Sequence, residues 1–335
     1  MVSGRLVTCG EAMAVLASPV VGPLRTAGSL ALSVAGAESN VAIGVARLGH
    51  PVTWIGRVGD DELGELVLRT LRAEGVDVAA VGREPDAPTG LMIKERRVGA
   101  VTRVHYYRSG SAGARLAAGD IHDGLLADAG IVHVTGITPA LGAGPAAAVE
   151  ALVAAARRRG VQVAVDVNYR ERLWPSRAAA AATLGPLARA ADYVVAGRDE
   201  LALISGRAAD GAAAAQDLPA GGAAAGDAAA AQELLGGGAR VVVVSHGDDG
   251  ADAWTADGVA HQPAVKVAAV DTVGAGDGLC AGFLSGVLDG LDPAAALERG
   301  VKAAAFAVAA TGDWEGLPRR DELELLALER GATVR

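Results

Sequence analysis

Short runs of β-branched and other apolar residues recur along the chain, at 5–10, 52–59, 131–136, 161–168, 192–197 and 240–247. Alanine-rich stretches of helical length separate most of these runs, at 40–49, 62–74, 145–159 and 181–190. Apolar strands that alternate with helices are typical of βαβ units around a buried parallel sheet. The final third is predicted to be helical, at 276–289, 293–310 and 319–330. The pattern therefore predicts an α/β fold.

Two regions break this alternation. Residues 12–35 show no helical period, and residues 89–108 contain two strand-like runs on either side of a Gly-Ala pair, which is typical of a hairpin. Together they predict a small antiparallel sheet inserted in the α/β body, as a lid or an interface. Residues 206–232 are almost all Ala, Gly and Asp, so we interpret them as a low-complexity surface insertion without chemistry. The prediction is a single domain over residues 1–335.

Composition excludes several classes of protein. The chain is 51% hydrophobic but only 3% aromatic, so aliphatic side chains must build the core. Its net charge of −9, without a long basic run, argues against a nucleic-acid partner. It has neither a signal-peptide pattern nor an uncharged apolar stretch long enough to span a membrane, so we expect a cytoplasmic protein that does not bind membranes. The cysteines Cys9 and Cys280 lack metal-ligand spacing and are predicted to be buried free thiols.

The stretch DTVGAGDGLCAGF, residues 271–283, carries the clearest chemistry. A helix N-terminus leaves about four amide N–H groups unpartnered and holds roughly half a positive charge. Gly274, Ala275 and Gly276 have almost no side chain, so a phosphate can approach their backbone closely. Asp277 would then accept a proton from an attacking hydroxyl, help that is worth about 10²–10⁴-fold in rate. We expect the helix dipole to lower the pKa of Asp277.

Other interpretations of this turn are weaker. An aspartate after a glycine turn is also a common helix cap. Leu279 occupies the place of the third glycine in a dinucleotide-binding G-x-G-x-x-G fingerprint. A Walker A loop is excluded, because no lysine in the chain follows a glycine.

DTVGAGDGLCAGFLSG closely resembles the D-T-x-G-A-G-D signature of the ribokinase (PfkB) family of sugar kinases. AGAESNVAIGVARLG (35–49) and GRVGDDELGE (56–65) resemble further segments of that family, so the similarity covers nearly the whole chain. It implies a Rossmann-like, three-layer α/β/α domain with a small β-sheet lid, which agrees with the pattern above. It also implies that Asp277 is the catalytic base and that Gly274, Ala275 and Gly276 form an anion hole.

Charge near the second irregular region indicates the substrate class. Between residues 94 and 115 six basic side chains stand against Glu95 alone, a local charge of +5, and for most of them we prefer the interpretation as a solvated lid surface. Tyr106 and Arg108 share one face of a strand, as do Asn168 and Arg170 at the end of another. Strand C-termini are where open α/β sheets bind ligands. Two arginines that converge on one pocket suit a carboxylate, so we expect an acidic sugar.

The segments YYRSGSAGARL (106–116), DVNYRERLWP (166–175) and GDWEGLP (312–318) look like the 2-keto-3-deoxygluconate kinase branch of the family. The resemblance implies a set of sugar-binding residues: Gly36, Asn40, Tyr106, Arg108, Asn168, Arg170 and Asp313. For Asp313 a loop cap is the alternative role. The implied reaction is ATP-dependent phosphorylation of the terminal hydroxyl of the sugar acid.

VVVVSHGDDGA (241–251) resembles the nucleotide-binding strand and loop of the family. ATP is therefore predicted to contact Ser245, Gly247, Gly250, Gly274 and Gly276. Mg²⁺ is implied near Glu200, although Gly197 stands where the family often has an asparagine. A requirement for a monovalent cation is left open, and pairing of lid sheets implies a homo-oligomer. The histidines, His133, His246 and His261, are interpreted as isolated structural or exposed residues.

Three alternatives to the sugar-acid kinase stay open. The first is a kinase for a neutral sugar or a nucleoside, similar to fructokinase or ribokinase. The second is a sugar sensor without catalysis on the same scaffold, against which the intact Asp277 argues. The third is a nicotinamide-dependent oxidoreductase, for which the sequence has no proper fingerprint.

Overall fold

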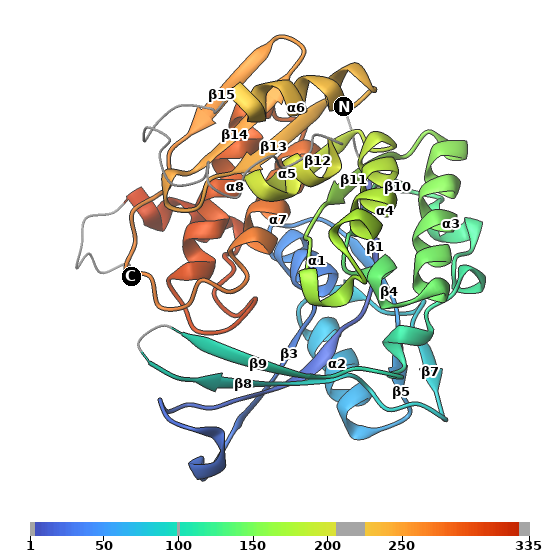
Figure 1. The fold of residues 1–335 in the computed structure, drawn as a ribbon, viewed down its shortest axis with the longest axis vertical. Helices are drawn as coiled ribbons and strands as arrows, with labels where there is room; N and C mark the ends of the chain where they lie inside the picture. The colour runs from blue at the N-terminus through green and yellow to red at the C-terminus, as the bar shows by residue number, and fades with distance from the viewer. Residues whose placement is uncertain (1–3, 99–100, 206–224, 328–335) are drawn as a thin grey trace.

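A nine-stranded sheet forms the centre of the molecule (Figure 1). The computed structural model describes residues 4–98, 101–205 and 225–327. The strands follow in the order β15 (Gly258–Gln262), β14 (Ala251–Thr255), β13 (Val241–Ser245), β12 (Tyr193–Gly197), β11 (Gln162–Asp166), β10 (Ala129–Thr135), β1 (Arg5–Cys9), β4 (Val52–Ile55) and β6 (Val76–Asp77). All pairs from β13 to β6 are parallel, whereas β14 and β15 form an antiparallel hairpin at one edge.

Helices cover both faces of this sheet. On one face lie α1 (Ala37–Arg47), α2 (Glu62–Ala73), α7 (Ala275–Leu288) and α8 (Pro293–Val308). On the other lie α3 (Ala143–Arg159), α4 (Arg177–Arg189), α5 (Arg198–Ile204) and α6 (Ala225–Gly236). Side chains alternate between the two cores along each strand, so Leu6 packs on the first face and Val7 on the second. The predicted three-layer α/β/α architecture is confirmed.

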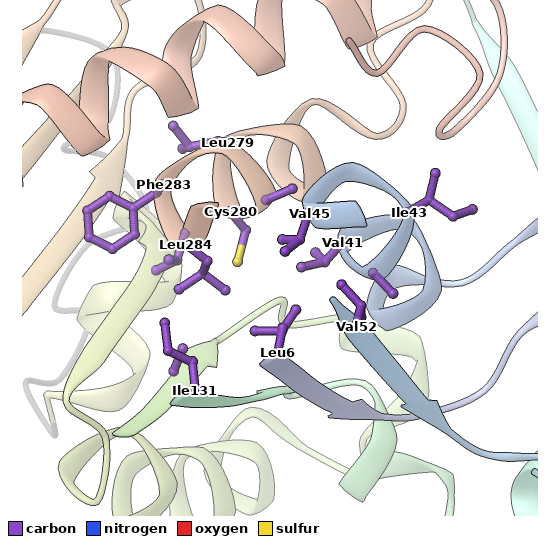
Figure 2. Close-up of a cluster of buried hydrophobic side chains, with 14 of the residues drawn as sticks. Leu6, Val41, Ile43, Val45, Val52, Ile131, Leu279, Cys280, Phe283 and Leu284 are labelled. Atoms are coloured by element: carbon purple, nitrogen blue, oxygen red, sulfur yellow. The ribbon is translucent and has the colours of Figure 1, made fainter. Parts of the chain in front are cut away.

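Helix α7 is the buried centre of the first helical layer. Figure 2 shows Cys280 and Leu284 of α7 converging with side chains of α1 on Leu6 and Ile131 of the sheet. On its other side, α7 packs against α8 through small residues. A Cβ at Gly282 would lie 2.6 Å from the carbonyl oxygen of Arg299. The two helix backbones are therefore in direct contact, which fixes the position of α7.

A separate small sheet contains β3 (Ala31–Ala35), β2 (Met13–Ala17), β8 (Leu91–Arg96) and β9 (Thr102–Tyr107), in that order. It lies below the body in Figure 1 and covers the space beneath α1 and α7. The β8–β9 and β2–β3 pairs are antiparallel, but β2 and β8 run parallel. The small sheet is thus mixed, and the prediction of an antiparallel sheet was wrong. Each hairpin is antiparallel, but the two hairpins pair with each other through β2 and β8, which run parallel. Two further short strands, β5 (Arg57–Gly59) and β7 (Gly82–Glu84), pair parallel.

Some predicted elements were wrong. Residues 251–262 form the β14–β15 hairpin, which was not among the predicted elements. Residues 320–327 form 3₁₀ turns instead of an α-helix. Of the predicted insertion, residues 206–224 lie outside the described residues, and α6 begins at Ala225. Within the described ranges, no helix combines the length and apolar character needed to cross a membrane.

Candidate active site

A cavity of ≈ 650 Å³ lies between the small sheet, the start of α7 and the carboxyl ends of β11, β12 and β13. This is the edge of an open α/β sheet at which ligands bind. Most of the predicted site residues line it: Gly36, Asn40, Tyr106, Arg108, Asn168, Arg170, Glu200, Ser245, Gly274, Gly276, Asp277 and Asp313. The lining does not include Ala275, Gly247 or Gly250. Segments far apart in the sequence therefore meet in one pocket.

The glycine turn begins α7 at the cavity wall. Gly274 is the N-cap and has a φ of +81°, and a Cβ there would lie 2.0 Å from the carbonyl oxygen of Asp313. Glycine is thus required for both conformation and space. A Cβ on Gly276 would meet nothing within 4 Å, so the backbone there faces open space. The first amide groups of α7 have no intrahelical acceptors and are accessible to an anion.

Asp277 lies in the first turn of α7 and is only 9% exposed. Asn40 Nδ2, from α1, donates a hydrogen bond of 2.7 Å to its Oδ2. Burial raises the pKa of Asp277 to about 7, although the bond from Asn40 opposes the rise. The expectation of a lowered pKa was wrong, because desolvation outweighs the helix dipole. A carboxyl with a pKa near neutrality is well matched to accepting a proton from an alcohol.

Arg108 follows β9 and lies at the junction of the small sheet with the body. Its guanidinium forms an ion pair with Glu11 and lies 5.7 Å from the centroid of the Tyr106 ring. Glu11 is buried and also accepts a hydrogen bond from Ser111 Oγ. The side chain of Glu38, in the first turn of α1, is buried close enough for the charge of Arg108 to lower its pKa, although burial raises it overall.

A strained turn after β11 positions the second arginine. Asn168 has a φ of +37°, and its Nδ2 donates a bond of 3.1 Å to Asp166 Oδ2. Asparagine tolerates this left-handed conformation better than most residues. Burial raises the pKa of Asp166 well above its usual range, and the charges of Glu200 and Asp277 raise it further. Arg170 is exposed in the cavity wall, and its charge favours the ionised form of Asp277.

Asp313 forms an ion pair with a residue of the small sheet. Lys94 of β8 forms a buried ion pair with its carboxylate. Burial raises the pKa of Asp313, and the charge of Lys94 opposes this. Asp313 lines both the main cavity and a second one of ≈ 280 Å³ next to the small sheet. Its backbone packs on Gly274.

In the loop that was predicted to contact ATP, Gly250 has a structural role. Gly250 has a φ of +104°, and a Cβ there would lie 2.1 Å from the carbonyl oxygen of Gln262. The glycine therefore allows the loop to pass under β15. His246 and His261 both hydrogen-bond to the buried Asp252, at 3.0 and 2.6 Å, so the interpretation of these histidines as isolated was wrong. A Cβ on Gly247, at φ +59°, would meet nothing within 4 Å.

The profile of the family described as "pfkB family carbohydrate kinase" matches residues 3–320. The chain belongs to this family. It is therefore a carbohydrate kinase, which uses a sugar and ATP as its substrates, and the resemblance found in the sequence is confirmed.

Relatives of this kinase share most of its length. It is 37% identical over 319 residues to a 2-dehydro-3-deoxygluconokinase of Bacillus subtilis, and the match covers 95% of this chain and 93% of that protein. A 2-dehydro-3-deoxygluconokinase of Thermoproteus tenax is 36% identical, over 96% and 93% of the two chains. The crystal structure of a PfkB protein from Polaromonas sp. JS666 is 33% identical, with a TM-score of 0.82 over 96% of this chain and 99% of that one.

The kinase has a donor set that suits Mg²⁺. Mg²⁺ retains several waters and uses one or two carboxylates together with substrate phosphates. Asp166 and Glu200 line the cavity, and Asn168 Oδ1 is buried there without a hydrogen-bond partner among the described residues. Glu200 Oε1 and Oε2 accept bonds from the amides of Tyr169 (2.6 Å) and Gly197 (2.8 Å). These bonds fix Glu200 in place, so a water-mediated contact fits it best.

The charged neighbours of the predicted site residues were not themselves predicted; they are Glu11, Glu38 and Lys94. A signal for Glu11 was available, because it follows the first strand at its carboxyl end, where sheets of this type bind ligands. No comparable signal exists for Lys94, which is 219 residues from Asp313 in the chain.

Proposed function

We propose that this kinase phosphorylates the terminal hydroxyl of 2-dehydro-3-deoxygluconate, giving the 6-phosphate. The observation that supports this most is that Arg108 and Arg170 both line the cavity that contains Asp277. Two guanidinium groups bind a carboxylate with directed, charge-assisted hydrogen bonds, and a neutral sugar would not need them. The names of the two relatives above point to the same sugar acid.

In the proposed mechanism, the arginines hold the carboxylate end of the sugar, with Tyr106 and Asn168 beside them. Gly36, Asn40 and Asp313 contact hydroxyl groups along the sugar. Its terminal hydroxyl then lies at Asp277, which accepts the proton as the oxygen attacks the γ-phosphorus of ATP, the bond from that phosphorus to the β,γ-bridging oxygen breaks and ADP leaves. The amides of Gly274, Ala275 and Gly276 stabilise the charge on the transferred group. When bound with ATP, Mg²⁺ supplies further positive charge at the phosphates.

Several accompanying roles belong to the same proposal. The small sheet acts as a lid that excludes water during phosphoryl transfer, because water in the site would otherwise hydrolyse ATP. ATP binds along Ser245, Gly247 and the glycine turn. Two copies associate through the outer faces of their lids, where Leu32 is 54% and Tyr107 62% exposed. A cytoplasmic location fits an enzyme that consumes ATP.

Substrate comparison tests the proposal. ADP release is measured with 2-dehydro-3-deoxygluconate, its C4 epimer 2-dehydro-3-deoxygalactonate, D-fructose and D-ribose. We expect kcat/KM to be at least about a hundredfold higher for the two acids, because a pocket with unpaired charged donors strongly rejects a substrate without the matching group. Equal values for the acids and D-fructose would contradict the role of the arginines and would favour a neutral-sugar kinase.

A further inference from the structure

Glu11 occupies a closely fitted position where the body joins the small sheet. It lies between β1, in the central sheet, and β2, in the small sheet, and is only 3% exposed. Glycines surround it: a Cβ at Gly90 would lie 2.8 Å from its Oε1, and one at Gly113 would lie 2.4 Å from its Cγ. A Cβ at Gly36 would lie 2.3 Å from its carbonyl oxygen. Larger residues at these positions would displace the carboxylate.

The carboxylate of Glu11 contacts two residues of the segment that follows β9, Arg108 and Ser111. Ser111 Oγ donates to Oε1 at 2.5 Å, and Nη2 of Arg108 pairs with Oε2. The side chain of Arg108 is itself only 13% exposed. Its Nε is buried and has no hydrogen-bond partner in the part of the chain that the structure describes. Glu11 therefore holds one nitrogen of a guanidinium that retains unused donor capacity beside the cavity.

We propose that Glu11 is a positioning residue for sugar-acid recognition, which fixes the Arg108 guanidinium so that its remaining N–H groups face the substrate carboxylate. This inference rests on the proposed function, because it assumes that Arg108 binds the sugar acid. Glu11 also lines the cavity.

The physical reason is conformational. An arginine side chain loses much rotamer freedom when it binds a ligand, and a partner that fixes it beforehand reduces that loss. Glu11 is suited to this task because Ser111 and the surrounding glycines restrict its own movement.

A double-mutant cycle tests the inference. Glu11→Gln, Arg108→Met and the double variant are assayed with 2-dehydro-3-deoxygluconate at saturating ATP, and KM for ATP is measured separately. We expect Glu11→Gln to lower kcat/KM for the sugar acid roughly tenfold, mainly through KM, because the ion pair that orients Arg108 is lost. KM for ATP stays within about twofold, and the double variant is no worse than Arg108→Met alone.

Each contrary result has a separate meaning. If the losses of the two single variants multiply in the double variant, Glu11 acts independently of Arg108 and the inference is wrong. If Arg108→Met alone keeps full kcat/KM for the sugar acid, the proposed function fails instead.

Two further variants guard against a general loss of folding. Ser111→Ala keeps both charges but removes one bond to Glu11, so it should raise KM for the sugar acid about two- to fivefold without changing KM for ATP. Glu84→Gln is the matched control, because Glu84 pairs with Arg57 and Arg115 near the small sheet without lining the cavity. It should leave both KM values unchanged. An unchanged KM in Ser111→Ala, or an equal effect of Glu84→Gln, would overturn the inference.

Discussion

At the scale of single residues, Asp277 shows two opposed effects on one carboxyl group. Its place in the first turn of α7 favours a negative charge through the helix dipole. Its burial disfavours the same charge and has the larger effect, since the pKa rises to about 7. Asn40 limits this rise through one hydrogen bond. As the proposed base, Asp277 is therefore partly protonated at neutral pH and should become fully active in mildly alkaline solution.

The first prediction concerns Asp277→Asn. Because the amide cannot accept the hydroxyl proton, kcat should fall about 10²–10⁴-fold, while the affinity for ATP stays nearly constant. In the parent enzyme, kcat should rise with pH through about 7 and then level off, because the deprotonated carboxyl is the active form. Steady-state ADP release between pH 5.5 and 9 measures both effects. A parent profile that is flat across this range would contradict the assignment of Asp277 as the base.

The stability of Asp277→Asn provides the control. The folded state binds the Asp277 proton more tightly than the unfolded chain, whose pKa is near 3.8, so this residue lowers the stability progressively as the pH rises from about 4 to 7. The variant should therefore be more stable than the parent enzyme at pH 8 and nearly equal to it at pH 4. Urea unfolding at both values measures this. A variant that is less stable at pH 8 would show that its lost activity comes from misfolding.

At the scale of elements, the sequence indicated some parts of the fold far better than others. Buried parallel strands read as continuous β-branched runs, so β10 to β13 were predicted with small errors at their ends. The β14–β15 hairpin was missed because its strands, ADAWT and GVAHQ, contain few β-branched residues, although Asp257-Gly258 is a hairpin signal. Most residues of the family motifs line the cavity, although Ala275, Gly247 and Gly250 do not. Their charged partners were not predicted, because nothing local in the sequence links Lys94 with Asp313.

The second prediction concerns the contact between α7 and α8. Gly282→Ala places a methyl group 2.6 Å from the carbonyl oxygen of Arg299, which is backbone and cannot move aside. We expect a loss of about 1–3 kcal/mol in the free energy of unfolding, as for other overpacked cores. Because α7 must shift, kcat should also fall, since its first turn carries the proposed anion hole. Urea unfolding and steady-state kinetics measure the two effects.

Gly226→Ala is the matched control for this substitution. Gly226 also lies in a helix, but a Cβ there would meet nothing within 4 Å. Alanine should stabilise this position by about 0.5–1 kcal/mol through its higher helix propensity, without changing kcat. If both variants gained stability, the close backbone packing of α7 and α8 would be disproved.

At the scale of the whole molecule, the small sheet is joined to the body through residues 313–315. Lys94 pairs with Asp313, Ser33 donates to Glu315, and Trp314 Nε1 donates to the carbonyl of Val34 at 2.8 Å. All three contacts start on the small sheet and end just beyond α8. Since the backbone of Asp313 packs directly on Gly274, the position of the small sheet is linked to the shape of the proposed anion hole.

The third prediction tests this link by replacing Lys94, with Lys302 as the control. Lys94→Met removes a charge from a buried pair and leaves Asp313 uncompensated, which should cost about 3–5 kcal/mol of unfolding free energy. It should also raise KM for the sugar and lower kcat. The double variant Lys94→Met/Asp313→Asn should recover part of the stability, because no unpaired charge remains, but not the KM. Lys302→Met breaks only an exposed pair with Glu298 and should change stability by less than about 0.5 kcal/mol. If Lys94→Met behaved like Lys302→Met in unfolding and in kinetics, the small sheet would not be coupled to the catalytic turn through this ion pair.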